Sequence, residues 1–151
     1  ENQKLIIMMH VIERFKSLYS DLTLITPTDL EKVYSDDIFF VDPIDSHQGI
    51  EKVKDYFSKL TEEAESCRFN IDVIVKCEDN DEGLHFLVNW TMHLILRNSG
   101  KRIELPGTTQ LKVHDDKICY HRDYYDLGTM VYEHIPVLGW IVKKIKAKLS
   151  S

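Results

Sequence analysis

The stretch "HRDYYD", residues 121–126, gathers side chains that could do acid–base chemistry. If it forms a strand, alternate side chains point to opposite faces, so His121, Asp123 and Tyr125 share one face. A carboxylate next to an imidazole can accept and return protons near neutral pH. The same pattern also fits an edge strand whose exposed ion pairs contribute little to stability. The residues alone therefore leave a catalytic pocket wall and a surface strand as alternatives.

Asp42 is the second candidate, because it follows the apolar run Ile38–Val41 and precedes Pro43. An Asp in this position commonly forms a turn. At the open end of a pocket, apolar surroundings would instead raise the pKa of its carboxyl group and make it a usable base. The local pattern favours the turn.

The run 84–97 alternates apolar and polar residues, which predicts a long strand. Its apolar face carries Phe86, Val88, Trp90, Met92, Leu94 and Leu96. A tryptophan and a methionine among aliphatic residues suit both a core and the wall of an apolar pocket. Periodicity does not separate these two roles.

Motifs for metal or cofactor chemistry are missing from the sequence. The seven histidines are scattered, and neither an HExxH pattern nor a CxxC pair occurs. His121 and Asp123 could share a metal ion, but no third ligand can be named. No P-loop, GxGxxG or GxSxG pattern occurs either. The sequence therefore predicts neither a metal nor a cofactor.

The elements that must position these residues are helices first and strands later. Helices are predicted over 4–20, over a short segment that Thr28 caps with Glu31 in a capping box, and over 50–60. A short β run, 38–42, and a loop, 43–49, lie between the last two helices. Further strands are predicted at 69–77, 84–97, 102–114 and 117–126.

Turn residues join the later strands at 98–101 and 114–117, which predicts an antiparallel meander. Pro106-Gly107 inside a strand predicts a bulge or a sharp bend. The order of elements predicts an α+β fold in which a curved antiparallel sheet wraps over the N-terminal helices. Such a sheet forms a cone, and its mouth is the expected ligand site.

Length and composition fit one domain, residues 1–151, with a C-terminal helical tail at 129–151 that breaks around 136–139. The net charge of −6 speaks against a nucleic-acid partner. No apolar run reaches transmembrane length, and the apolar start is too short for a signal peptide. The sequence has three cysteines, an odd number that does not fit a set of disulfide pairs, and this favours reduced thiols and a cytoplasmic location.

Two segments resemble a known superfamily. "YSDDIFFVDP…QGIEKVKDYF" is similar to the part of ketosteroid isomerase that carries its general base, and Asp42 stands at that base. "GKRIELPGTTQLKVHDDKICYHRDYYDL" is similar to a stretch of limonene epoxide hydrolase, and Asp123 falls on its water-activating carboxylate. From the first helix to Met130 the chain thus resembles the SnoaL-like, or nuclear transport factor 2-like, superfamily, which implies a cone-shaped α+β barrel.

The resemblance also shows departures from both enzymes. Where the hydrolase has an Arg and a second Asp, this chain has Trp90 and Met92. Where the hydrolase has a Tyr and an Asn, this chain has Phe40 and Asp42. The oxyanion Asp of the isomerase falls at Thr109, and its Tyr falls near Phe15 or Tyr19. Polyketide cyclases of this superfamily use a His and Asp region near the last strand, which is compatible with His121 and Asp123.

The resemblance implies that Asp42 and Asp123 face one apolar pocket and act with His121. Two carboxylates in a dry site push their pKa values apart and can serve as acid and base. The expected chemistry is isomerase-, cyclase- or hydrolase-type proton transfer on a small hydrophobic molecule. The residues expected to contact that molecule are Tyr19, Phe40, Trp90, Met92, Thr109 and Tyr125.

The rival hypothesis is a non-catalytic ligand-binding or dimerisation module. Members of the superfamily commonly dimerise through the outer face of the sheet, so the resemblance implies a homodimer. The tail "GWIVKKIKAKL" adds a basic amphipathic helix, which could lie on an anionic membrane surface. The pattern favours a helix that instead docks its apolar stripe, with Trp140, Ile141, Ile145 and Leu149, on the domain.

Overall fold

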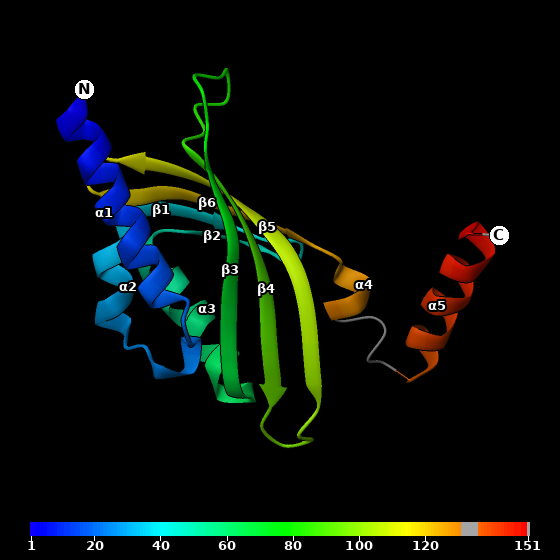
Figure 1. The fold of residues 1–151 in the computed structure, drawn as a ribbon. Coiled ribbons are helices and arrows are strands. Elements are labelled where there is room, and N and C mark those ends of the chain that lie inside the picture. Colours follow the sequence, from blue (N-terminus) through cyan, green and yellow to red (C-terminus); the bar gives the residue numbers. More distant parts are fainter. Residues whose placement is uncertain (131–135, 151) are drawn as a thin grey trace.

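The computed structural model describes residues 1–130 and 136–150, in which helices precede a six-stranded sheet (Figure 1). The helices are α1 (Asn2–Leu18), the short 3-10 helix η1 (Leu22–Leu24), α2 (Pro27–Val33), α3 (Ile50–Glu63), α4 (Leu127–Met130) and α5 (Pro136–Ser150). The strands are β1 (Tyr34–Val41), β2 (Ser46–Gln48), β3 (Ala64–Lys76), β4 (Phe86–Leu96), β5 (Arg102–His114) and β6 (Lys117–Tyr125). The predicted α+β class is confirmed.

The sheet has the order β2-β1-β6-β5-β4-β3 and does not close on itself. Strands β3 to β6 form the predicted antiparallel meander. β1 pairs with β6 in parallel, so the sheet is mixed and not purely antiparallel. In this pairing Phe40 lies beside His121. The parallel pair therefore brings the end of β1, next to Asp42, alongside the "HRDYYD" strand.

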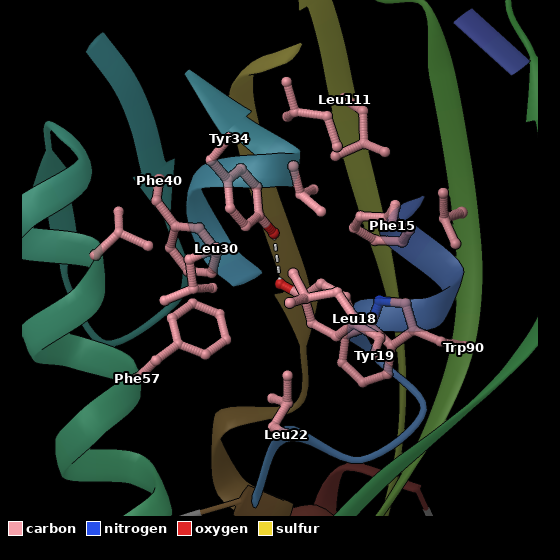
Figure 2. Close-up of a cluster of buried hydrophobic side chains, with 14 of the residues drawn as sticks. Phe15, Leu18, Tyr19, Leu22, Leu30, Tyr34, Phe40, Phe57, Trp90 and Leu111 are labelled. Carbon is pink, nitrogen blue, oxygen red and sulfur yellow. Dashed lines mark hydrogen bonds between the residues drawn. The ribbon is translucent and has the colours of Figure 1, made fainter. Parts of the chain in front are cut away.

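The long strands curve, and the three N-terminal helices cover one side of the sheet (Figure 1). Most buried side chains of α1 recur every three or four residues, as in a helix that buries one face: Met8, Val11, Ile12, Phe15 and Leu18. On β4 the predicted apolar face is buried from Phe86 to Leu94. Aromatic rings from α1, β1, α3 and β4 meet in the interior (Figure 2).

Some local predictions were wrong. The helix α2 is capped by Thr26, whose backbone N–H donates to the carboxylate of Asp29 at 2.8 Å, and not by Thr28. Pro27 follows as the first helical residue, where a missing N–H costs nothing. β1 begins at Tyr34, and the expected loop 43–49 contains β2. The predicted capping box thus exists, but it begins two residues earlier than the sequence indicated.

Pro106 and Gly107 form no bulge, because β5 pairs with β4 without a register shift from Leu111 to Arg102. Register shifts occur instead between Lys112 and Val113 of β5. Gly107 makes room for a neighbouring ring: a Cβ atom there would lie 2.3 Å from Cη2 of Trp90. A close approach of this kind requires glycine.

The tail differs most from expectation. α5 runs unbroken from Pro136 through Gly139, and the segment 131–135 before it lies outside the described residues. The apolar stripe of α5 is not docked on the domain, since Trp140 is 62% exposed and Leu149 81% exposed. None of the described helices is long and apolar enough to span a membrane.

We predict that Gly107→Ala lowers the free energy of unfolding by about 1–3 kcal/mol, because the added methyl group overlaps the Trp90 ring. Urea denaturation monitored by circular dichroism measures the change. In a Trp90→Phe background, which removes the outer ring atoms, the same substitution should cost less than about 0.5 kcal/mol. An equal cost in both backgrounds would contradict this account of Gly107.

Candidate active site

Three neighbouring strands place one arm of the site. The register sets Trp90 of β4 opposite Gly107 of β5, and Thr109 opposite Asp123 of β6. The indole Nε1–H of Trp90 donates to Oγ1 of Thr109 at 2.7 Å. The Thr109 hydroxyl in turn donates to Oδ1 of Asp123 at 2.5 Å. Trp90, which the sequence identified only as apolar, thus has a polar role through its N–H group.

A second arm reaches Asp123 from the helices. Nε2 of His121 lies 2.7 Å from Oδ1 of Asp123. Nδ1 of the same ring lies 2.9 Å from the Tyr34 hydroxyl, which is 2.6 Å from the Tyr19 hydroxyl (Figure 2). Tyr19 follows the last residue of α1, and Tyr34 is the first residue of β1. A continuous hydrogen-bonded chain therefore runs from Tyr19 to Asp123.

His121 is enclosed by aromatic rings and is only 1% exposed. Its imidazole stacks on Phe40 with 4.1 Å between the ring centroids. On the Tyr19 ring it lies at 6.1 Å and nearly parallel. The Asp123 side chain is 16% exposed, so the chain of hydrogen bonds begins in the core and ends near a partly accessible carboxylate.

Asp123 lines a small cavity inside the cone, with a volume of about 40 Å³. Of the predicted contact residues, Tyr19, Phe40, Trp90, Met92 and Tyr125 line it too. His121 and Thr109 lie behind the wall, where they hold Asp123. Sites for small molecules usually measure about 300–1,000 Å³, whereas this cavity holds about one water molecule.

Asp42 does not line the cavity, although it is buried. Its Oδ1 accepts the backbone N–H groups of Ile44 at 2.8 Å and Asp45 at 3.0 Å, which is the turn that local sequence favoured. Its Oδ2 accepts the hydroxyl of Tyr56 at 2.5 Å. Tyr56 lies between Asp42 and the interior, so the structure does not bring Asp42 and Asp123 into direct contact.

The carboxylates of Asp42 and Asp123 nevertheless both raise the pKa of the same side chain, Tyr125. Burial raises the pKa of Tyr125 well above its usual range, and the charges of Asp42 and Asp123 raise it further. Burial and the neighbouring Asp42 have the same effect on the pKa of Tyr56. Both hydroxyls therefore stay protonated at neutral pH and remain hydrogen-bond donors.

Tyr34 and Tyr56 are the site residues that sequence reasoning missed. Tyr34 follows the short helix predicted after Thr28, and the structure places it at the start of β1 with its side chain buried. Tyr56 falls in the helix predicted over 50–60 and is indistinguishable from a core residue by spacing. Only the residue type indicates a role in a hydrogen-bonded site, because a buried Tyr usually needs a partner for its hydroxyl.

Larger hollows lie elsewhere on the surface. The groove between α1 and α2 has a volume of about 450 Å³ and is lined partly by Arg14, Asp29 and Lys32. It contains no member of the hydrogen-bonded chain. Among the residues that the structure describes, no group of three or more His, Cys, Asp or Glu side chains could hold a metal ion. The acid–base groups thus gather at the small interior cavity.

Solved structures share this fold. An NTF2-like protein of unknown function from Burkholderia pseudomallei K96243 has a TM-score of 0.70 at 11% identity, over 83% of this chain and 95% of that one. An LEH-like epoxide hydrolase from M. tuberculosis has a TM-score of 0.63 at 17% identity, over 82% of this chain and 86% of that one. A putative SnoaL-like polyketide cyclase from Jannaschia sp. CCS1 has a TM-score of 0.64 at 13% identity, over 80% of this chain and 88% of that one.

No curated protein matches this chain. At such low identities the structures establish the fold alone. The sequence itself matches the model of the SnoaL-like domain over residues 24–121, which extends from η1 to the histidine of the site. Most of the sheet, α2 and α3 lie within this match. The chain belongs to the SnoaL-like domain family.

Proposed function

We propose that this chain is an acid–base enzyme that binds a small apolar molecule inside the cone, with Asp123 as its general base. One observation carries the proposal: all hydrogen bonds of Asp123 end on Oδ1. Among the described residues, Oδ2 has no hydrogen-bond partner. A carboxylate held on one oxygen at an apolar cavity has its second oxygen available for a proton.

The proposed role of Asp123 as a base requires it to be ionised, and this requirement sets a direction for the protons of the chain. Ionised Asp123 only accepts, so Thr109 and Nε2–H of His121 both donate to it. With neutral His121, Nδ1 accepts from Tyr34, and Tyr34 accepts from Tyr19. Every hydrogen bond in both arms then points toward Asp123, which stabilises the carboxylate in position.

The proposed step is removal of a proton from a substrate carbon or from a water molecule by Oδ2 of Asp123. The cavity has room for about one water molecule, which favours activation of water. Tyr125 has no hydrogen-bond partner among the described residues, and its raised pKa keeps the phenol protonated. Its hydroxyl is therefore suited to donate to an oxygen on which negative charge develops.

A larger substrate requires the cavity to widen. Met130 of α4 contributes to the wall, and a methionine side chain rearranges more readily than a branched or aromatic one. Similar folds include proteins named as an epoxide hydrolase and as a putative polyketide cyclase. The substrate class we propose is thus a small apolar ketone or epoxide, and the fold alone does not choose between them.

The small cavity also favours a second candidate, a non-catalytic module. Aromatic and aliphatic side chains pack together in the interior and leave only this small cavity beside Asp123. The β3 strand exposes Val73 and Val75, 49% and 47% respectively, and such an outer face suits a homodimer. In this alternative the hydrogen bonds around His121 only stabilise the core.

We predict that Tyr34→Phe lowers the free energy of unfolding by about 2 kcal/mol, because it leaves the Tyr19 hydroxyl and Nδ1 of His121 unpaired. Tyr19→Phe should cost clearly less, since it leaves only an acceptor unpaired. Urea denaturation measures both, and Tyr124→Phe on the exposed face of β6 is the control. Equal costs for Tyr19 and Tyr34 would contradict the proposed proton direction.

We predict that Asp123→Asn lowers turnover by about 10²–10⁴-fold while the fold is retained. The assay follows solvent deuterium exchange into apolar ketones and hydrolysis of apolar epoxides by NMR. Asp81→Asn, in an exposed loop, is the control and should keep full activity. Asp42→Asn should mainly lower stability, because its oxygens hold a turn and Tyr56.

Full activity of Asp123→Asn would refute the proposed base. If the wild-type chain turns over none of these compounds but binds them as well as Asp123→Asn does, the non-catalytic module is supported instead.

A further inference from the structure

The helix α5 presents an apolar stripe to solvent. Ile141, Ile145 and Leu149 recur every four residues and therefore lie on one side of the helix. They are 40%, 53% and 81% exposed, and Trp140, which lies about 100° around the helix from Ile141, is 62% exposed. Monomeric soluble proteins seldom leave such a contiguous stripe uncovered. An uncovered stripe of this kind indicates a binding surface.

The charge of α5 is opposite to that of the whole chain. Residues 136–150 contain four lysines and no acidic residue, whereas the net charge of the chain is −6. Lys143 and Lys144 are exposed, and Nζ of Lys144 lies 4.7 Å from the centre of the Trp140 ring. The partner of this helix must therefore accept both apolar side chains and positive charge.

We propose that α5 binds the surface of an anionic lipid membrane, with its axis parallel to the bilayer. The apolar stripe enters the boundary between headgroups and acyl chains, and the lysines contact anionic headgroups. Trp140 suits this boundary, because its ring has an apolar body and a polar edge. Lys144 and Lys148 lie within roughly 60° of Ile141 around the helix, and lysines beside the stripe match headgroups better than they match a purely apolar protein groove.

The helix is also linked to the cavity. Nζ of Lys146 contacts Oδ2 of Asp126 at 3.0 Å, just before α4. A β-carbon on Gly128 of α4 would lie 3.6 Å from Cγ1 of Val142, so the two helices are packed together. Met130, at the end of α4, lines the cavity. If the proposed function holds, a membrane-bound α5 places the cavity close to apolar substrates dissolved in the bilayer.

The test is co-sedimentation of the chain with vesicles of phosphatidylglycerol and phosphatidylcholine, compared with phosphatidylcholine alone. We expect binding to the anionic vesicles that weakens at high salt. Lys143→Glu with Lys144→Glu should lower the partition coefficient about thirty-fold or more, at about 1 kcal/mol per lysine. Ile145→Glu with Leu149→Glu should abolish binding.

Matched controls carry the same changes elsewhere. Lys52→Glu with Lys59→Glu on α3, and Ile6→Glu with Leu24→Glu near the N-terminus, alter exposed residues and should leave binding unchanged. Absence of sedimentation with anionic vesicles, or equal loss in the controls, overturns the proposal. A dimer in size-exclusion chromatography that Ile145→Glu with Leu149→Glu dissociates also overturns it, because a second copy then covers the stripe. None of these readouts depends on catalytic activity.

Discussion

The hydrogen bond between His121 and Asp123 is the interaction on which the interior depends. His121 is almost fully enclosed by Phe40, Tyr19 and other rings, and no bulk water reaches its nitrogens. Buried polar groups without partners are costly, so both ring nitrogens require a protein partner. Asp123 satisfies one nitrogen and Tyr34 the other. β1 and β6, which supply these two partners, must therefore pair in one register.

The two carboxylates first identified in the sequence have different surroundings, and this difference separates their roles. Asp42 accepts hydrogen bonds on both oxygens, from two backbone N–H groups and from Tyr56. Asp123 accepts on one oxygen only. A carboxylate with filled acceptor sites holds structure, whereas one with an open oxygen at a cavity has capacity for chemistry. Local sequence favoured a turn for Asp42, whereas the open oxygen of Asp123 is seen only in its contacts.

Much of the fold could be predicted from sequence, because periodicity is strong where one face is buried. The apolar face of β4 and the existence of a helix over 4–20 were both correct for this reason. The shared face of His121 and Asp123 followed from the two-residue period of a strand. The partners Tyr34 and Tyr56 did not follow, since they come from other elements and spacing does not reveal contacts across the core.

The tail shows the opposite limit of sequence reasoning. An amphipathic pattern predicts that an apolar stripe will be covered, and it does not say by what. For α1 the covering surface is the sheet, whereas the stripe of α5 remains uncovered. The difference arises from position, because the cone already has helices on its concave side when the chain reaches α5 (Figure 1).

The parallel pairing of β1 with β6 has a consequence for how this molecule is made. Tyr34 pairs with Ile118, and more than half of the chain lies between them. A ribosome releases β1 long before β6 exists, so β1 has only the short β2 as a partner in the sheet until β6 is synthesised. Contacts this distant in sequence slow folding and leave a strand edge open to aggregation. Because β6 is synthesised long after β1, the hydrogen bonds around His121 are among the last to form.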